Sequence, residues 1–132
     1  MSCKVIVLEE FKRDAKKLVK KYRSLKQELA DFQVQLQENP RMGTLITENT
    51  YKVRLAVKSK GKGKRGGLRV LTYVVELRWE VEEGESSSEE TTVFLLTLYD
   101  KSDMENISDA ALTELVETAK TILSEEDDQQ DE

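Results

Sequence analysis

The spacing of apolar residues along the first forty positions predicts a strand followed by two helices. Residues 3–8 (CKVIVL) are apolar and rich in β-branched side chains, as in a strand. From Glu9 onward, apolar residues recur every three or four positions, as on one face of a helix. They form two stripes, Phe11, Ala15, Leu18, Tyr22 and Leu25, and then Leu25, Leu29, Phe32 and Leu36. Ser24 is a candidate cap between two helices, the alternative being one bent helix, and Pro40 ends the pattern because the residue before a proline disfavours the α conformation. We expect a hairpin of two helices.

The remainder of the chain predicts three strands and a last helix. Residues 51–57 alternate strictly between apolar and polar, residues 68–81 form a long strand, and residues 92–99 are its hairpin partner. The acidic, serine-rich stretch within residues 80–90 has nothing to bury and is predicted to be a loop. Ser108 or Asp109 is the expected N-cap of the last helix, whose apolar side chains recur from Leu112 to Leu123.

The resulting order, β-α-α-β-β-β-α, predicts an α+β fold. The N-terminal strand and the helix hairpin would pack on a small antiparallel sheet, with the helix hairpin on one face and a C-terminal helix after the last strand. We expect one domain over residues 1–124 and a disordered acidic tail over residues 125–132, since the stretch SEEDDQQDE is almost entirely polar.

Composition removes several classes of function. The chain has no His and a single Cys, Cys3, so Ser-His and Cys-His nucleophiles, Cys-based zinc sites and internal disulfides are all excluded. We therefore expect no metal or other cofactor. The N-terminal apolar run is too short for a signal peptide and no stretch approaches a membrane span, so we expect a cytoplasmic protein without membrane contact.

Positive charge is concentrated in residues 51–75. Of the 21 Lys and Arg residues eight lie there, and this leaves 13 against all 26 Asp and Glu residues in the rest of the chain. The eight are Lys52, Arg54, Lys58, Lys60, Lys62, Lys64, Arg65 and Arg69. A cluster of this kind attracts a polyanion, and nucleic acid is the obvious one because its phosphates release counterions when Lys and Arg bind.

Two other interpretations of this run compete with nucleic-acid binding. Residues 61–66 (GKGKRG) match G-x-G-x-x-G, but the dinucleotide fingerprint needs a helix after it, and the next segment predicts a strand. A solvated basic face is the plain alternative. Nucleic-acid contact is favoured modestly because Lys52, Arg54 and Arg69 fall on predicted strands. Three aromatic residues, Tyr51, Tyr73 and Tyr99, are interleaved with the basic residues and would offer stacking surfaces for single strands.

Several segments together resemble the RelE/ParE superfamily of bacterial toxins from toxin–antitoxin pairs, more closely its RelE and HigB branch. The similarity extends from about Val5 to about Leu123 and is carried by FKRDAKKLVKKY, YKVRL, GKGKRGGLRVLTYVV and VFLLTLYDKSDMENIS. It implies a toxin that cleaves mRNA on the ribosome and thereby inhibits translation. It also implies a cognate antitoxin as a protein partner, with the ribosome and mRNA as the other partners.

The resemblance also implies roles for individual residues in metal-independent cleavage. Lys52 and Arg54 correspond to the paired basic strand residues of RelE, Arg69 to the arginine expected on the scissile phosphate, and Lys101 to the basic residue after the last strand. The Lys-rich loop of HigB-like members corresponds to Lys62, Lys64 and Arg65. We expect these three residues, together with Lys58 and Lys60 before them, to bind RNA. No aromatic residue follows Tyr99, so Tyr73 or Tyr99 would take over stacking on the substrate base.

Two alternative functions remain open at this point. One is a gyrase inhibitor of the ParE type, against which the density of cations between Lys52 and Arg69 argues. The other is a catalytically inactive member that binds nucleic acid or regulates.

Overall fold

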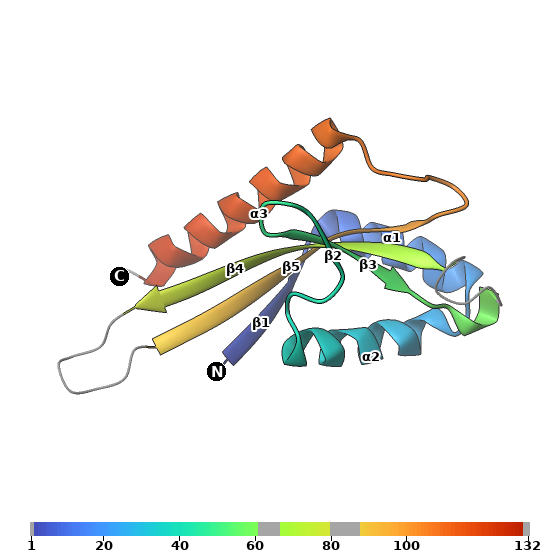
Figure 1. Ribbon diagram of the computed structural model, residues 1–132, viewed down its shortest axis with the longest axis horizontal. Helices are drawn as coiled ribbons and strands as arrows, with labels where there is room; N and C mark the ends of the chain where they lie inside the picture. Colours follow the sequence, from blue (N-terminus) through green and yellow to red (C-terminus); the bar gives the residue numbers. More distant parts are fainter. Residues whose placement is uncertain (1, 61–66, 80–87, 131–132) are drawn as a thin grey trace.

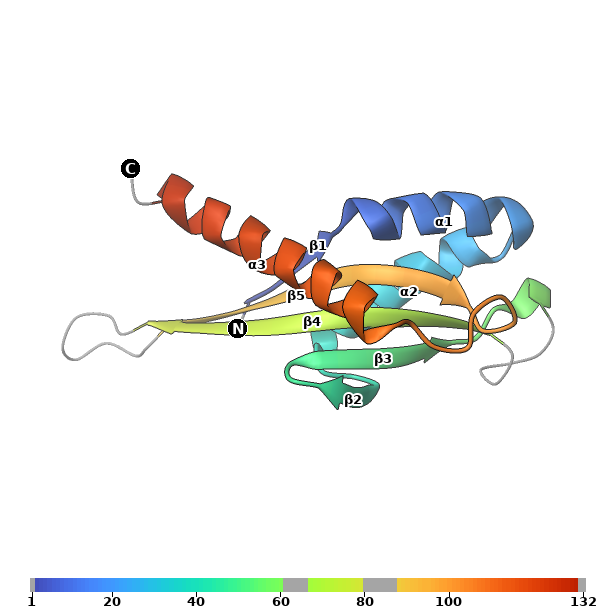
Figure 2. The same cartoon turned by 90° about the horizontal axis from the view of Figure 1, so that it is seen from above.

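The computed structural model describes residues 2–60, 67–79 and 88–130, with three helices and a five-stranded mixed sheet (Figures 1 and 2). The predicted α+β class is confirmed. In chain order the elements are β1 (Ser2–Val7), α1 (Glu9–Lys21), α2 (Leu25–Glu38), β2 (Thr44–Thr47), β3 (Thr50–Leu55), the 3-10 turn η1 (Lys58–Lys60), β4 (Leu68–Trp79), β5 (Ser88–Asp100) and α3 (Asp109–Gln130).

The strands are ordered β1-β5-β4-β3-β2 across the sheet. Strand β1 runs parallel to β5, and every other neighbouring pair is antiparallel, so the predicted meander with the N-terminal strand at one side is confirmed. Strand β2 was not predicted, because four residues are too few to establish an alternating pattern. It pairs with β3 through a tight turn in which Asn49 has a positive φ of 56°, a conformation that Asn tolerates better than most residues.

The first two helices are separate elements joined by a short turn. Tyr22 leaves the helical conformation at the end of α1, and α2 starts three residues later. Ser24 occupies the cap position of α2, but its hydroxyl donates to Glu28 Oε1 at 2.9 Å and no side-chain cap bond to the backbone is formed. Asn39, the residue before Pro40, caps the C-terminus of α2, as predicted.

The two faces of the sheet are covered by different helices. Figure 1 shows α2 below the sheet and α3 above it. On one face, side chains of α1 and α2 such as Phe11 and Phe32 pack with Val53, Val70 and other strand residues. On the other face, Leu71, Tyr73, Phe94, Leu96 and Tyr99 pack against α3, which contributes the buried Ala119. Both faces of β4 and β5 are consequently buried, which accounts for the nearly continuous apolar runs in their sequences.

Helix α3 begins where the sequence predicts and ends later. The Ser108 hydroxyl accepts a hydrogen bond from the Ala111 backbone N–H at 3.2 Å, so Ser108 is the N-cap. The helix continues to Gln130, six residues beyond residue 124, where the sequence predicts the domain to end. Once the apolar residues anchor the first turns, each further residue adds one backbone hydrogen bond, and Glu and Gln are good helix formers.

The last residues of the predicted acidic loop belong to a strand. Ser88, Glu89 and Glu90 belong to β5, since the long hairpin pairs Trp79 with Ser88. Residues 80–87 lie outside the described residues. None of the described helices is both long and apolar enough to cross a membrane.

Candidate nucleic-acid interface

Basic side chains from two neighbouring strands share the sheet face on which α3 packs. Lys52 and Arg54 alternate with inward residues on β3 and therefore point to the same face. Arg54 lies directly opposite Arg69 on β4, and Arg69 lies directly opposite Tyr99 on β5. The register thus places the three predicted catalytic residues of the strands, Lys52, Arg54 and Arg69, beside one another on one surface.

Arg54 and Arg69 bring two like charges to opposed positions of this row. Like charges directly opposite each other on paired strands destabilise a sheet. Arg69 is only 4% exposed although Arg54 is exposed. Burial lowers the pKa of the Arg69 guanidinium, and the positive charge of Arg54 lowers it further. One guanidinium nitrogen of Arg69 donates to the Leu68 carbonyl oxygen at 3.2 Å, which fixes the side chain against the strand.

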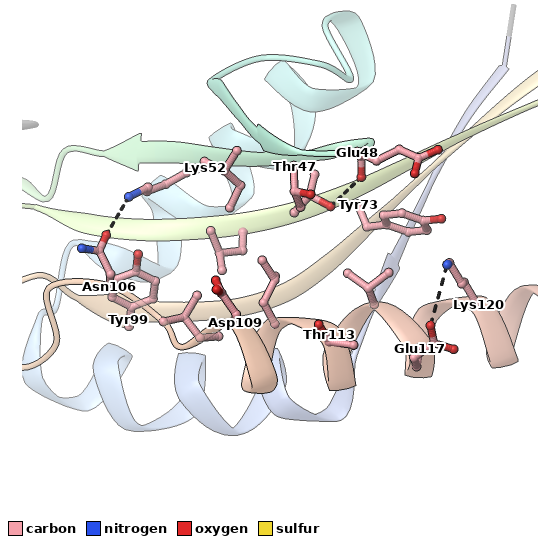
Figure 3. A pocket seen from close by; sticks show the side chains of 16 residues that line it. Thr47, Glu48, Lys52, Tyr73, Tyr99, Asn106, Asp109, Thr113, Glu117 and Lys120 are labelled. Carbon is pink, nitrogen blue, oxygen red and sulfur yellow. Dashed lines mark hydrogen bonds and ion pairs between the residues drawn. The ribbon is translucent and has the colours of Figure 1, made fainter.

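A pocket of about 670 Å³ adjoins the basic row, between α3 and the hairpin of β2 and β3. Figure 3 shows Lys52, Tyr99 and Asn106 gathered at one end of it and Lys120 at the other. The Lys52 ammonium donates to Asn106 Oδ1 at 3.1 Å, and Lys120 lies 3.7 Å from Glu117 Oε1. Lys52 and Arg54 are two residues apart on β3, which corresponds to about 7 Å along the strand. The arginine pair therefore lies that distance beyond the end of the pocket at which Lys52 is found.

The predicted stacking residues are not presented to solvent. Tyr73 and Tyr99 are 8% and 6% exposed, and both belong to the cluster beneath α3. The Tyr73 ring packs against Phe94 with ring centroids 6.2 Å apart. Tyr51 lies on the opposite face, where its hydroxyl accepts a hydrogen bond from Arg41 at 3.0 Å. Tyr73 and Tyr99 nevertheless line the pocket beside Lys52, so their role in stacking stays a prediction; the sequence did not reveal that α3 covers this face.

Lys60 was predicted to bind RNA but is engaged inside the protein. Its ammonium forms an ion pair with Asp100 and lies 5.7 Å from the centre of the Tyr22 ring. Its side chain is 9% exposed and that of Asp100 is fully buried. Lys58, the other basic residue of η1, is exposed, whereas Lys62, Lys64 and Arg65 lie outside the described residues. The sequence could not reveal this difference, since Lys60 and Asp100 are 40 residues apart.

Lys101 immediately follows Asp100, the last residue of β5, and its side chain is exposed. Leu68 pairs with Asp100 and Arg69 with Tyr99, so Lys101 begins the turn at the end of the sheet where Arg69 enters β4. The predicted pairing of the last two strands therefore brings Lys101 to the same end as the arginine pair.

A second basic segment reaches the same end of the molecule. The hydroxyls of Ser24 and Ser59 lie 2.8 Å apart, and the Lys58 backbone N–H donates to Glu28 Oε2 at 2.8 Å. These contacts join the turn between α1 and α2 to η1. Lys58 therefore shares a basic surface with the exposed cations around that turn: Lys20, Lys21, Arg23 and Lys26.

Two carboxylates that bond to distant parts of the chain were missed by sequence reasoning, one partly buried and away from the basic row, the other buried beside it. Asp14 on α1 accepts hydrogen bonds from the Thr97 hydroxyl at 2.7 Å and from the Leu98 backbone N–H at 3.1 Å. Asp100 is the other, and both looked like ordinary surface acids because their partners are distant in sequence. Within the described residues no group of three or more His, Cys, Asp or Glu side chains is placed to hold a metal ion.

No protein-family model matches the chain.

Proposed function

We propose that this protein is a RelE-like toxin that cleaves mRNA on the ribosome without a metal ion. The observation that carries the proposal is the direct opposition of Arg54 and Arg69 across β3 and β4, with Lys52 on the same face. Two guanidinium groups at opposed positions suit a ligand that carries negative charge between them. The phosphodiester of RNA is such a ligand, and Arg binds its oxygens through two parallel hydrogen bonds.

The chemistry proposed for this site is an internal transfer at phosphorus. The ribose 2′-hydroxyl attacks the adjacent phosphate and loses its proton to a general base, while the 5′-oxygen leaves and takes a proton from a general acid. The products are a 2′,3′-cyclic phosphate and a 5′-hydroxyl. Arg54 and Arg69 stabilise the extra negative charge of the phosphorane, and Lys52 and Lys101 are the candidates for the two proton transfers.

The pocket beside Lys52 supports the same assignment. Its volume of about 670 Å³ lies within the range of roughly 300–1,000 Å³ typical of ligand sites. A nucleotide whose phosphate lies on the arginine pair has room for its neighbouring groups there. The exposed cations of the α1–α2 turn and η1 would contact further phosphates, which suits a large RNA such as the ribosome. A cognate antitoxin would silence the protein by covering this cationic surface.

A second candidate is an RNA-binding member that does not cleave. The burial of Arg69 favours it, since a side chain that is 4% exposed reaches a phosphate only if the ligand enters between the strands and α3. In this case the more exposed Lys52, Arg54 and Lys58 bind RNA, and the phosphodiester stays intact because Arg69 does not reach it.

The test is inducible expression of the wild type and of Arg69→Gln and Lys101→Gln variants, followed by mapping of mRNA ends. We expect growth arrest and new mRNA 5′ ends with the wild type and neither with the variants. In vitro, cleavage should require ribosomes. Growth arrest that survives both substitutions, without new mRNA ends, would contradict the proposal; a block of DNA supercoiling would point to a gyrase inhibitor, and RNA binding without cleavage to the second candidate.

A further inference from the structure

The carboxylate of Asp100 is the centre of a buried polar network at the basic end of the molecule. Asp100 is 2% exposed. Its Oδ2 accepts a hydrogen bond from the Tyr22 hydroxyl at 2.5 Å. Its Oδ1 accepts from the Lys60 ammonium, from the Ser102 hydroxyl at 2.6 Å and from the Ser102 backbone N–H at 3.0 Å. Four donors from three segments therefore converge on one side chain.

Each of these segments adjoins basic residues of the proposed site. Tyr22 ends α1 and lies in the turn with the exposed cations; Lys60 ends η1; and Ser102 follows Lys101. The backbone carbonyl of Asp100 also accepts hydrogen bonds from the N–H groups of Asp103 at 3.0 Å and Met104 at 3.1 Å. The turn that carries Lys101 is thus closed on both the side chain and the backbone of Asp100.

We propose that Asp100 is a positioning residue, which orients Lys101 through the Ser102 turn and fixes η1 beside the site through Lys60. The inference rests on the proposed function, because the reaction it serves is the cleavage of RNA. Asp100 is buried and does not touch the substrate; it acts through the residues that it holds.

The hydrogen bonds around Asp100 stabilise its buried negative charge and so fix the segments that donate them. A buried carboxylate is stable only when charge and hydrogen bonds compensate its desolvation. Burial alone would raise the pKa of Asp100, but the hydrogen bonds from Lys60, Ser102 and Tyr22 outweigh it and hold the pKa far below its usual range. The carboxylate is therefore fully charged at neutral pH and keeps all four donors oriented. A misplaced catalytic group costs on the order of 100-fold in rate per 1 Å, so the orientation of Lys101 has a direct kinetic consequence.

The experiment compares Asp100→Asn with Lys60→Met and with Asp14→Asn as a matched control. Asp14 is also a partly buried carboxylate bonded to another element, in this case to β5 from α1, but it holds none of the basic segments. The measurements are kcat and KM for mRNA on programmed ribosomes, and amide hydrogen exchange over residues 58–60 and 101–104 in the free protein.

Asp100→Asn is expected to lower kcat by roughly 10- to 100-fold and to accelerate exchange in both segments. Lys60→Met should accelerate exchange only over residues 58–60 and leave kcat nearly unchanged. Because η1 must then be ordered when RNA binds, KM should rise by roughly 2- to 10-fold. Asp14→Asn should leave kcat, KM and both exchange rates unchanged.

The outcomes separate this inference from the proposed function. Wild-type protein without ribonuclease activity would overturn the proposed function, and the exchange measurement would then still decide whether Asp100 holds both segments. An Asp100→Asn protein with wild-type kcat, or with unchanged exchange over residues 101–104, overturns the positioning role. If Asp100→Asn fails to fold, Tyr22→Phe and Lys60→Met are measured in its place. Equal effects of Lys60→Met and Asp14→Asn on kcat and KM would also overturn the positioning role of Asp100.

Discussion

Arg54 on β3 and Arg69 on β4 are directly opposed in an antiparallel pair, and Arg69 is buried while Arg54 is exposed. Two cations in this register oppose folding, and the pKa of Arg69 is lowered by burial and by Arg54. Such an arrangement is typical of a binding site, where residues are retained for function at the expense of stability.

Replacing Arg54 by Gln should therefore stabilise the folded protein while lowering the rate of cleavage. We expect a gain of roughly 0.2–1 kcal/mol in the free energy of unfolding, the range for cross-strand pairs, measured by urea denaturation at low salt. Lys16→Gln on α1 removes one exposed charge elsewhere and is the control, with no gain expected. A less stable Arg54→Gln protein would show that the arginine pair is not under repulsion.

Gly43→Ala should destabilise the strand that carries Lys52. Gly43 has a φ of +98°, and an added Cβ would lie 2.5 Å from the Lys52 carbonyl oxygen and 2.9 Å from Val53 Cγ2. Backbone strain of this kind costs about 1–3 kcal/mol, which thermal unfolding would detect. Thr44→Ala at the neighbouring exposed position should change the stability by no more than about 0.5 kcal/mol. Equal stability of the two variants would contradict the close contact.

Ser108→Ala removes the cap of α3. The lost hydrogen bond to the Ala111 N–H should lower the free energy of unfolding by about 1 kcal/mol. The control is Thr118→Ala within the same helix, where Ala is the better helix former and the exposed Thr118 hydroxyl only donates to the Glu114 carbonyl oxygen. Ser108→Ala with wild-type stability would place the start of α3 elsewhere.

The carboxylates of Asp100, which is buried, and Asp14, which is partly buried, should give opposite dependences of stability on pH. The pKa of Asp100 lies below its ordinary 3.8, so the unfolded chain takes up that proton first, and the stability due to Asp100 is present above about pH 3.8 and is lost as the pH falls. Burial raises the pKa of Asp14 above 3.8 despite the hydrogen bonds from Thr97 and Leu98. The folded protein takes up that proton first, so the contribution of Asp14 decreases as the pH rises from 3.8 through the raised pKa.

Urea midpoints between about pH 2 and pH 7 would check this pair of predictions. Asp100→Asn should weaken the acid-side loss of stability, and Asp14→Asn should remove the decrease at higher pH. Parallel curves for the two variants would contradict the opposite shifts of their pKa values.

The sequence predicts the elements and the charged strands because these depend on local pattern. The apolar spacing marks both N-terminal helices, alternation marks β3, and Ser108 marks the start of α3. The antiparallel meander follows from the short connections between consecutive strands. The opposition of Arg54 and Arg69 could not be predicted, because register depends on how the whole hairpin pairs.

The remaining features depend on contacts between distant residues. The ion pair of Lys60 with Asp100 and the burial of Tyr73 and Tyr99 under α3 join segments that no local pattern relates. The continuation of α3 to Gln130 reflects propagation of the helix from its packed first half. The composition of this segment, mostly acids and glutamines, does not by itself indicate a helix.

The central claim is that the arginine pair stabilises charge on an RNA phosphate during cleavage. The most direct measurement is the single-turnover rate of mRNA cleavage on programmed ribosomes by the wild type, Arg54→Gln, Arg69→Gln and Lys16→Gln, with the fragment ends identified chemically. We expect 2′,3′-cyclic phosphate and 5′-hydroxyl ends from the wild type and Lys16→Gln, and a rate lower by about 10²–10³-fold in each arginine variant, as for the loss of one oxyanion donor. Intact mRNA with the wild type, or cleavage at the wild-type rate by Arg69→Gln, would contradict the account.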